Sequence, residues 1–100
     1  MSELTLVSAD QRPLKPLVEA ALANELRLLE AGIQRTEQRL REYEAEHEMS
    51  TQEFIRRFEA DEFEETLESA EWIGEYRLLV RLQEKADTLR GIEFANGFPL

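Results

Sequence analysis

The chain of 100 residues has no cysteine, one histidine, four glycines and three prolines. The lack of cysteine excludes a disulfide framework, a cysteine zinc site and thiol chemistry. A Ser-His-Asp triad would have to use His47, the single histidine. No apolar run approaches the ~20 residues of a membrane-spanning helix, and the first residues lack the basic and apolar regions of a signal peptide. We therefore expect one soluble, cytoplasmic domain.

Basic residues are the minority, with 12 Lys and Arg against 22 Asp and Glu and a formal net charge of -10. The whole excess lies in residues 42–71, which hold twelve acidic side chains and two basic ones. Such a surface repels nucleic-acid phosphates and anionic membranes, and it steers a basic partner toward itself. The alternative is a solvated acidic surface that only aids solubility.

Residues 14–48 predict one long helix, because Ala, Leu, Glu, Arg and Gln dominate the run. Its apolar positions alternate in steps of four and three, the spacing of a coiled-coil seam that also includes Thr36 and His47. The seam residues predicted to mediate self-association are Leu22, Leu26, Leu29, Ile33, Leu40 and Tyr43. A straight helix of this length overshoots a compact body, so we expect an elongated molecule or a kink near Gly32.

A second helix is predicted to begin at Thr51. Ser50-Thr-Gln-Glu53 has the pattern of a capping box, and Met49 with Phe54 completes a hydrophobic staple. The acidic run that follows, residues 59–71, weakens a helix through like charges, so we expect a loop or a frayed turn there. Thr66 and Ser69 are the candidate N-caps of the next helix.

The last helix is predicted over residues 69–90, with Gly91 as its C′ residue. The resulting fold class is all-α: an elongated helical hairpin of two long helices, with a short capped helix at the elbow, dimerising into a bundle. The expected organisation is an N-terminal arm (1–13), a helical domain (14–91) and an apolar tail (92–100). The aromatic residues near the elbow are expected to pack as core and to anchor an interface: Phe54, Phe58, Phe63, Trp72 and Tyr76.

Catalytic and metal-binding motifs are sparse. Glu44 and His47 have the Glu-x-x-His spacing of half a di-iron site, but nothing marks the bridging carboxylates or the dry core that such a site needs. The EF-hand, P-loop, nucleophile-elbow and His-Glu-x-x-His patterns do not occur. We expect no catalytic residue, no metal and no cofactor, and therefore no enzyme.

Several short strings carry a family resemblance: Leu40-Arg-Glu-Tyr43-Glu, Met49-Ser-Thr-Gln-Glu-Phe54, Arg57-Phe-Glu59, Glu71-Trp72 and Tyr76-Arg-Leu78. Over residues 37–90 the chain resembles short acidic helical proteins of bacteria and archaea that are antitoxins of toxin–antitoxin pairs. The chain departs from them at His47-Glu48, where a glycine-containing end such as Tyr-Gly is expected. The resemblance implies a protein that binds and neutralises a toxin without catalysis. No basic recognition helix is present, so a DNA-binding role is not carried over.

Two hypotheses follow. In the first, the chain binds a small basic protein, a toxin, through its acidic elbow and its tail. The predicted contact residues are Glu59, Asp61, Glu62, Phe63, Glu64, Glu65, Glu68, Trp72, Phe94 and Phe98. In the second, the chain is a homo-oligomeric coiled-coil or helical-bundle module without an inhibitory role. Neither hypothesis involves direct contact with nucleic acid or a membrane, and both allow a homodimer.

Overall fold

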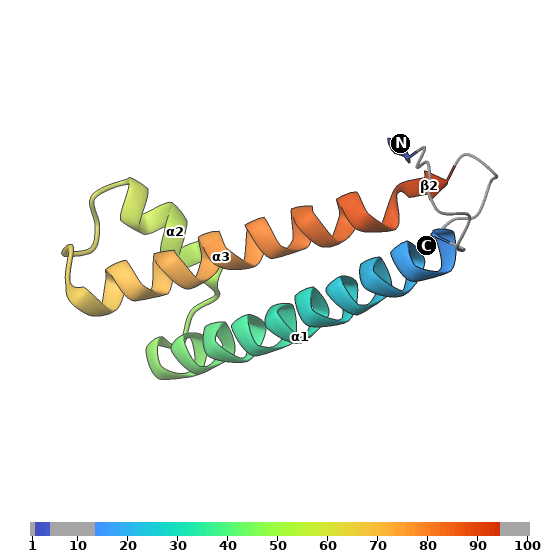
Figure 1. Ribbon diagram of the computed structural model, residues 1–100. Helices are drawn as coiled ribbons and strands as arrows, with labels where there is room; N and C mark the ends of the chain where they lie inside the picture. Colours follow the sequence, from blue (N-terminus) through green and yellow to red (C-terminus); the bar gives the residue numbers. More distant parts are fainter. Residues whose placement is uncertain (1, 5–13, 95–100) are drawn as a thin grey trace. The chain divides into compact units, whose positions relative to one another are not determined.

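The computed structural model describes residues 2–4 and 14–94 (Figure 1). Helix α1 spans Lys15–His47, the short helix α2 spans Thr51–Glu59, and α3 spans Leu67–Arg90. The strands β1 and β2 span Ser2–Leu4 and Ile92–Phe94. The predicted set of two long helices and a short one, in contact with each other, is confirmed. None of the helices in the described part of the chain has the length and apolar composition needed to cross a membrane.

The chain divides into two compact units, one made of residues 1–31 with 82–100 and the other of residues 32–81. The boundary falls at Gly32 on the first long helix, yet α1 continues as one α-helix from Lys15 to His47. Thr36, which interrupts the apolar seam, is buried, and its hydroxyl donates to the Gly32 carbonyl over 2.8 Å. This bond back along the helix explains how a polar residue is accommodated on the seam.

The unit of residues 32–81 has an aromatic core. Leu40 and Tyr43 of α1, Phe54 of α2 and Trp72 of α3 form its buried centre. Here α1 and α3 run antiparallel, because Tyr43 contacts Glu71 and the later residue His47 contacts the earlier residue Glu68. The remaining predicted aromatics pack around this centre with several aliphatic residues: Met49, Ile55, Phe58, Phe63, Ile73, Tyr76 and Leu79. The predicted clustering of aromatic residues at the elbow is therefore confirmed.

The unit of residues 1–31 and 82–100 has a smaller core. Its buried apolar residues are Leu29, Ala86 and Ile92, and Glu30 forms an ion pair with Arg90 at 3.9 Å. In the same unit β1 pairs with β2 in parallel, with Ser2 opposite Ile92. This strand pair was not predicted, since the two segments were expected to be an arm and a tail. Residues 5–13 and 95–100 of those segments lie outside the described residues.

Helix α2 begins at Thr51 as predicted, with Ser50 as its N-cap. The Ser50 hydroxyl accepts from the Glu53 N–H over 3.1 Å. The Glu53 carboxylate, which a capping box would turn back toward Ser50, instead accepts from Arg56 and Arg57. A second carboxylate serves this helix end, because Glu44 of α1 accepts from the Thr51 N–H over 2.8 Å. Helix α1 thereby helps to position the start of α2.

Helix α3 begins at Leu67, two residues before the predicted start. Thr66 and Ser69 cap it reciprocally: Ser69 N–H donates to Thr66 Oγ1 over 3.1 Å, and Thr66 N–H donates to Ser69 Oγ over 2.8 Å. The expectation of a loop or frayed turn over residues 59–71 is therefore wrong for Glu59, which ends α2, and for residues 67–71, of which 69–71 also fall within the predicted last helix. The reciprocal cap, together with the favourable position of Glu68 in the first turn, outweighs the repulsion between like charges.

Two helix ends use a left-handed residue that is not glycine. Glu48 follows α1 with a φ of 53°, and Asp61 follows the cap of α2 with a φ of 58°. Each is followed by a bond that closes the helix end, from Met49 N–H to the Glu44 carbonyl and from Glu62 N–H to the Arg57 carbonyl. Gly91 directly follows α3, as predicted, but its φ is not in the left-handed range.

Candidate functional site

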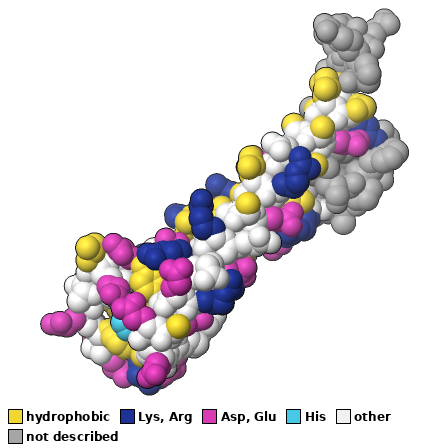
Figure 2. Space-filling view, turned by 90° about the horizontal axis from the view of Figure 1, so that it is seen from below, with side chains coloured by type: hydrophobic (Ala, Val, Ile, Leu, Met, Phe, Trp, Pro, Cys, Tyr) yellow, Lys and Arg dark blue, Asp and Glu magenta, His cyan; other side chains and the backbone are white. Residues whose placement is uncertain are grey.

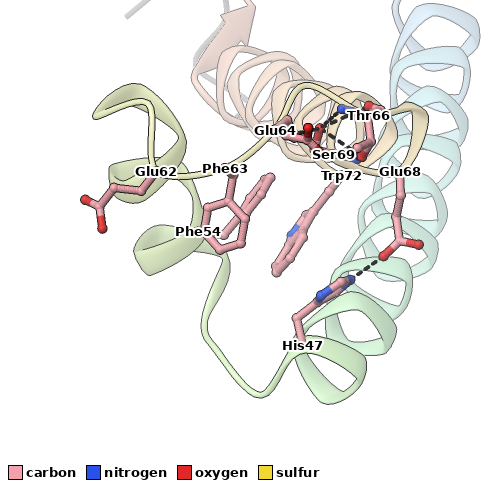
Figure 3. Close-up of a pocket in the computed structure, with 9 residues that line it drawn as sticks. All are labelled: His47, Phe54, Glu62, Phe63, Glu64, Thr66, Glu68, Ser69 and Trp72. Carbon is pink, nitrogen blue, oxygen red and sulfur yellow. Dashed lines mark hydrogen bonds and ion pairs between the residues drawn. The ribbon is translucent and has the colours of Figure 1, made fainter.

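A pocket of about 560 Å³ lies in the unit of residues 32–81, where the end of α1, helix α2, the loop 60–66 and the first turns of α3 meet (Figure 3). Half of the predicted partner-binding residues line it: Glu62, Phe63, Glu64, Glu68 and Trp72. Four further lining residues were not among the predicted ones: His47, Phe54, Thr66 and Ser69.

Trp72 forms the inner wall of this pocket and is held on several sides. Its ring stacks on Phe54 with centroids 3.9 Å apart and an angle of 2°, and on His47 with centroids 5.2 Å apart. Its indole N–H donates to Thr51 Oγ1 over 3.0 Å. Only 1% of Trp72 is exposed, so it shapes the pocket from inside and offers a partner little surface of its own.

Acidic side chains form the rim. The side chains of Glu62 and Glu64 are exposed and form no hydrogen bond or ion pair within the described part of the chain, although Glu62 interacts electrostatically with Arg56. Glu68 contacts His47, as the dashed line in Figure 3 marks. Figure 2 shows acidic side chains gathered around the histidine, with apolar surface between them. The rim therefore carries negative charge next to an aromatic wall.

The loop that carries this rim is anchored by Ser69. This side chain is 7% exposed, and its Oγ lies 3.1 Å from the Glu64 carbonyl and 3.0 Å from the Thr66 carbonyl. Its single proton can be donated to either carbonyl, while the oxygen accepts from Thr66 N–H. The hydroxyl is thus committed to backbone groups, and its role is to fix the acidic loop against α3.

The described residues that line the pocket do not include the remaining predicted contact residues. Glu59, Asp61 and Glu65 are exposed but do not line it. Phe94 belongs to β2 in the other unit, and Phe98 lies outside the described residues. The pocket thus gathers the members of the predicted set that lie between Glu62 and Trp72, with the exception of Glu65.

Among the described residues, one group of side chains could hold a metal ion. Glu46, His47 and Glu68 each offer one ligand atom, and these atoms lie within 4.8 Å of one another. Glu44, which the Glu-x-x-His spacing pairs with His47, is not in this group. Its carboxylate instead accepts a hydrogen bond from the Thr51 N–H. All three side chains of the group lie at the surface, and His47 already has Glu68 as its partner. The group alone does not indicate a metal centre, since exposed carboxylates are well hydrated without one.

Four groups near the elbow have shifted pKa values: Arg39, Tyr43, Glu53 and Arg56. Arg56 and Arg57 donate hydrogen bonds to the Glu53 carboxylate and lower its pKa from 4.5 to about 2. Burial raises the pKa of Tyr43, and the nearby Arg39 guanidinium partly opposes this shift. Arg39 lies 5.0 Å from the centre of the Tyr43 ring, so the chain already holds one arginine against an aromatic face.

The seam of α1 is used within the chain itself. Leu29, Leu40 and Tyr43 are buried in the single chain. Leu22, Leu26 and Ile33 are half-buried. The buried seam residues therefore contribute to the chain's own cores. The half-buried ones keep part of their side-chain surface exposed.

Acidic side chains and aromatic rings line the pocket together, an arrangement that can hold a cation. Among the described residues that line it, the hydroxyl of Ser69 is bonded to backbone and the imidazole of His47 is paired with Glu68. Comparison of the chain with models of known protein families, with curated proteins and with solved structures found no match in any of the three.

Proposed function

We propose that this chain is a non-catalytic binding protein that neutralises a small basic protein, as an antitoxin neutralises its toxin. The observation that supports this most directly is the pocket at the elbow, which Glu62, Glu64 and Glu68 line together with Phe63. Exposed carboxylates beside a partly exposed aromatic ring favour a basic partner, both by steering its approach and by pairing with it on contact. The resemblance to antitoxins over residues 37–90 points to the same class of partner.

The first experiment is to purify the tagged chain from its own or a close host at low salt and to identify what accompanies it in stoichiometric amount. A small basic protein that is released by salt is the expected result. If that protein arrests growth when produced alone and no longer does so when co-produced with this chain, neutralisation is established. Recovery of the chain alone under these conditions would contradict the proposal.

Matched charge reversals then test the acidic elbow. Glu62→Lys with Glu64→Lys should slow association with the partner about tenfold or more at low salt and weaken its salt dependence. Glu25→Lys with Glu84→Lys changes the net charge equally at exposed positions outside the acidic stretch, and it should have a much smaller effect. Equal effects of the two pairs would show that only total charge matters.

A homo-oligomeric helical module is the second candidate, and exposed leucines on α1 favour it. Leu17 and Leu28 are 67% and 61% exposed. They lie eleven residues apart and therefore on the same face of the helix. A second copy could cover this face, whereas the half-buried seam residues Leu22 and Leu26 lie on the opposite side of the helix.

Sedimentation equilibrium tests this second candidate. If α1 mediates self-association, the wild-type chain should be a dimer or larger at micromolar concentration. Leu17→Asp with Leu28→Asp should then give a monomer with unchanged helical content. These positions are better than Leu29, which is buried in the chain's own core and would be needed for folding in any case. A wild-type monomer at all concentrations would eliminate this candidate.

A further inference from the structure

We propose that the pocket at the elbow is an anchor site for one arginine side chain of the partner. This inference rests on the proposed function for the identity of the partner, but the pocket itself can be tested without it. The pocket has an aromatic wall, a negatively charged rim and a volume of about 560 Å³. That volume is large enough for an extended side chain together with the backbone that carries it.

The negative charges at the rim favour a positively charged ligand. Among the described residues, the carboxylates of Glu62 and Glu64 form no hydrogen bond or ion pair, although Glu62 lies close enough to Arg56 to interact with its charge. A cation can therefore approach Glu64 without breaking an existing ion pair. The nearby arginines Arg56 and Arg57 are bonded to Glu53 and are not pocket-lining residues. A phosphate or a carboxylate would therefore meet acidic side chains with no free guanidinium to pair with.

The aromatic wall favours a guanidinium over an ammonium group. Phe63 is half-buried and contacts Phe54 edge to face with centroids 5.4 Å apart, so its ring is braced from within while part of it stays exposed. A guanidinium is planar and weakly hydrated, and it can stack on such a ring while it donates two hydrogen bonds to a carboxylate. An ammonium is a compact, strongly hydrated charge and cannot make both contacts in the same way.

The acidic loop is also held in place before a ligand binds. Ser69 ties the Glu64 carbonyl and the Thr66 backbone to the first turn of α3. Trp72, fixed by Phe54 and by Thr51, closes the inner side. A pocket that is already ordered loses little conformational entropy when a side chain enters it.

The test uses a short acetylated and amidated peptide with one arginine among alanines, titrated into the intact chain at low salt. A matched peptide carries citrulline, which keeps the shape of arginine without the charge, and a third carries lysine. Fluorescence of Trp72, the only tryptophan, and amide NMR shifts of residues 62–69 report binding. We expect saturable binding of the arginine peptide, weaker binding of the lysine peptide and none of the citrulline peptide.

Matched variants locate the site. Glu64→Gln should weaken binding of the arginine peptide about three- to fivefold, as expected for one exposed ion pair. Phe63→Leu keeps an apolar side chain but removes the ring, and should weaken binding about two- to fivefold. Glu59→Gln removes the same charge from the acidic stretch outside the pocket and should leave binding unchanged.

Equal binding of the arginine and citrulline peptides, or equal effects of Glu64→Gln and Glu59→Gln, would overturn the anchor site. Those results would leave the proposed function intact if the basic partner still binds in a salt-dependent way. If the arginine peptide binds in the pocket while no basic protein partner is recovered, the anchor site holds and the proposed function fails.

Discussion

Trp72 donates its indole N–H to the hydroxyl of Thr51 over 3.0 Å, and both side chains are buried. The bond joins the first residue of α2 to the inner wall of the pocket. Because Thr51 also donates its backbone N–H to Glu44, the three helices meet at this residue.

Thr51→Val keeps the shape of the side chain but leaves the buried indole N–H without an acceptor. We expect the free energy of unfolding to fall by ~1–3 kcal/mol, the usual cost of an unsatisfied buried donor. Urea unfolding followed by circular dichroism measures it. Thr88→Val is the control, since its hydroxyl donates to the Glu84 carbonyl at an exposed position and should matter much less. Equal losses would mean that the buried bond contributes nothing specific.

Ser69→Ala removes the hydroxyl that anchors the acidic loop. The Thr66 N–H loses the closer of its two acceptors and keeps only the Glu64 carbonyl, and α3 loses one half of its cap. We therefore expect a loss of ~1–2 kcal/mol in the free energy of unfolding. Amide hydrogen exchange should accelerate at Thr66. Ser50→Ala, which removes the cap of α2, should instead accelerate exchange at Glu53. Unchanged exchange at Thr66 would show that Ser69 does not hold the loop.

Glu53 makes stability depend on pH. Its pKa in the folded chain is about 2 against an ordinary value of 4.5. A carboxylate with a lowered pKa stabilises the folded state fully above its unfolded pKa, and this stabilisation is lost as pH falls through the folded value. Glu53→Gln should therefore be less stable than wild type at pH 7, and the difference should shrink between pH 5 and pH 2.

Urea unfolding of both chains at pH 7, 4 and 2 measures this change. The same comparison in a background of Arg56→Gln and Arg57→Gln removes the donors that lower the pKa. There, the effect of Glu53→Gln should no longer vary with pH in this window. If the effect of Glu53→Gln still varied with pH in that background, groups other than Arg56 and Arg57 would be responsible for the pH dependence.

Glu48→Gly should stabilise the chain. A left-handed conformation costs a non-glycine residue ~1–2 kcal/mol, and glycine avoids that cost but loses more chain entropy. The expected net gain is ~0.5–1 kcal/mol, measured as a higher urea midpoint. Glu46→Gly removes the same charge two residues earlier, inside α1, and should destabilise by a similar amount. A loss for both variants would contradict the assigned backbone conformation of Glu48.

Local signals in the sequence predicted most of the helical fold. The start of α2 follows from Ser50 and the apolar residues that flank it, and the length of α1 follows from its composition and seam. The start of α3 was placed too late because the charge of residues 59–71 was considered without the reciprocal bonds of Thr66 and Ser69. In the sequence, the start of α3 is marked only by two small polar residues three positions apart. This pattern indicates a helix start less strongly than Ser-x-x-Glu does.

The pocket could be predicted only in part. The acidic residues of its rim could be predicted because they lie in the charged stretch. Trp72 could be predicted because it is a large aromatic residue near the elbow. The placement of His47 on Trp72 depends on the antiparallel register of α1 and α3, which no local pattern encodes. The strand pair was missed for a related reason, since Ser2–Leu4 and Ile92–Phe94 have no pattern that would match them to each other.

The pairing of β1 with β2 has a consequence for the order of folding. Ser2 faces Ile92, so this contact closes nearly the whole chain into one ring. Closing so long a segment costs more entropy than a three-residue ladder returns, unless the helices between the strands have formed first. The ladder should therefore be the last element to assemble and the first to open. Its backbone amides should exchange with solvent well before those around Trp72 begin to do so.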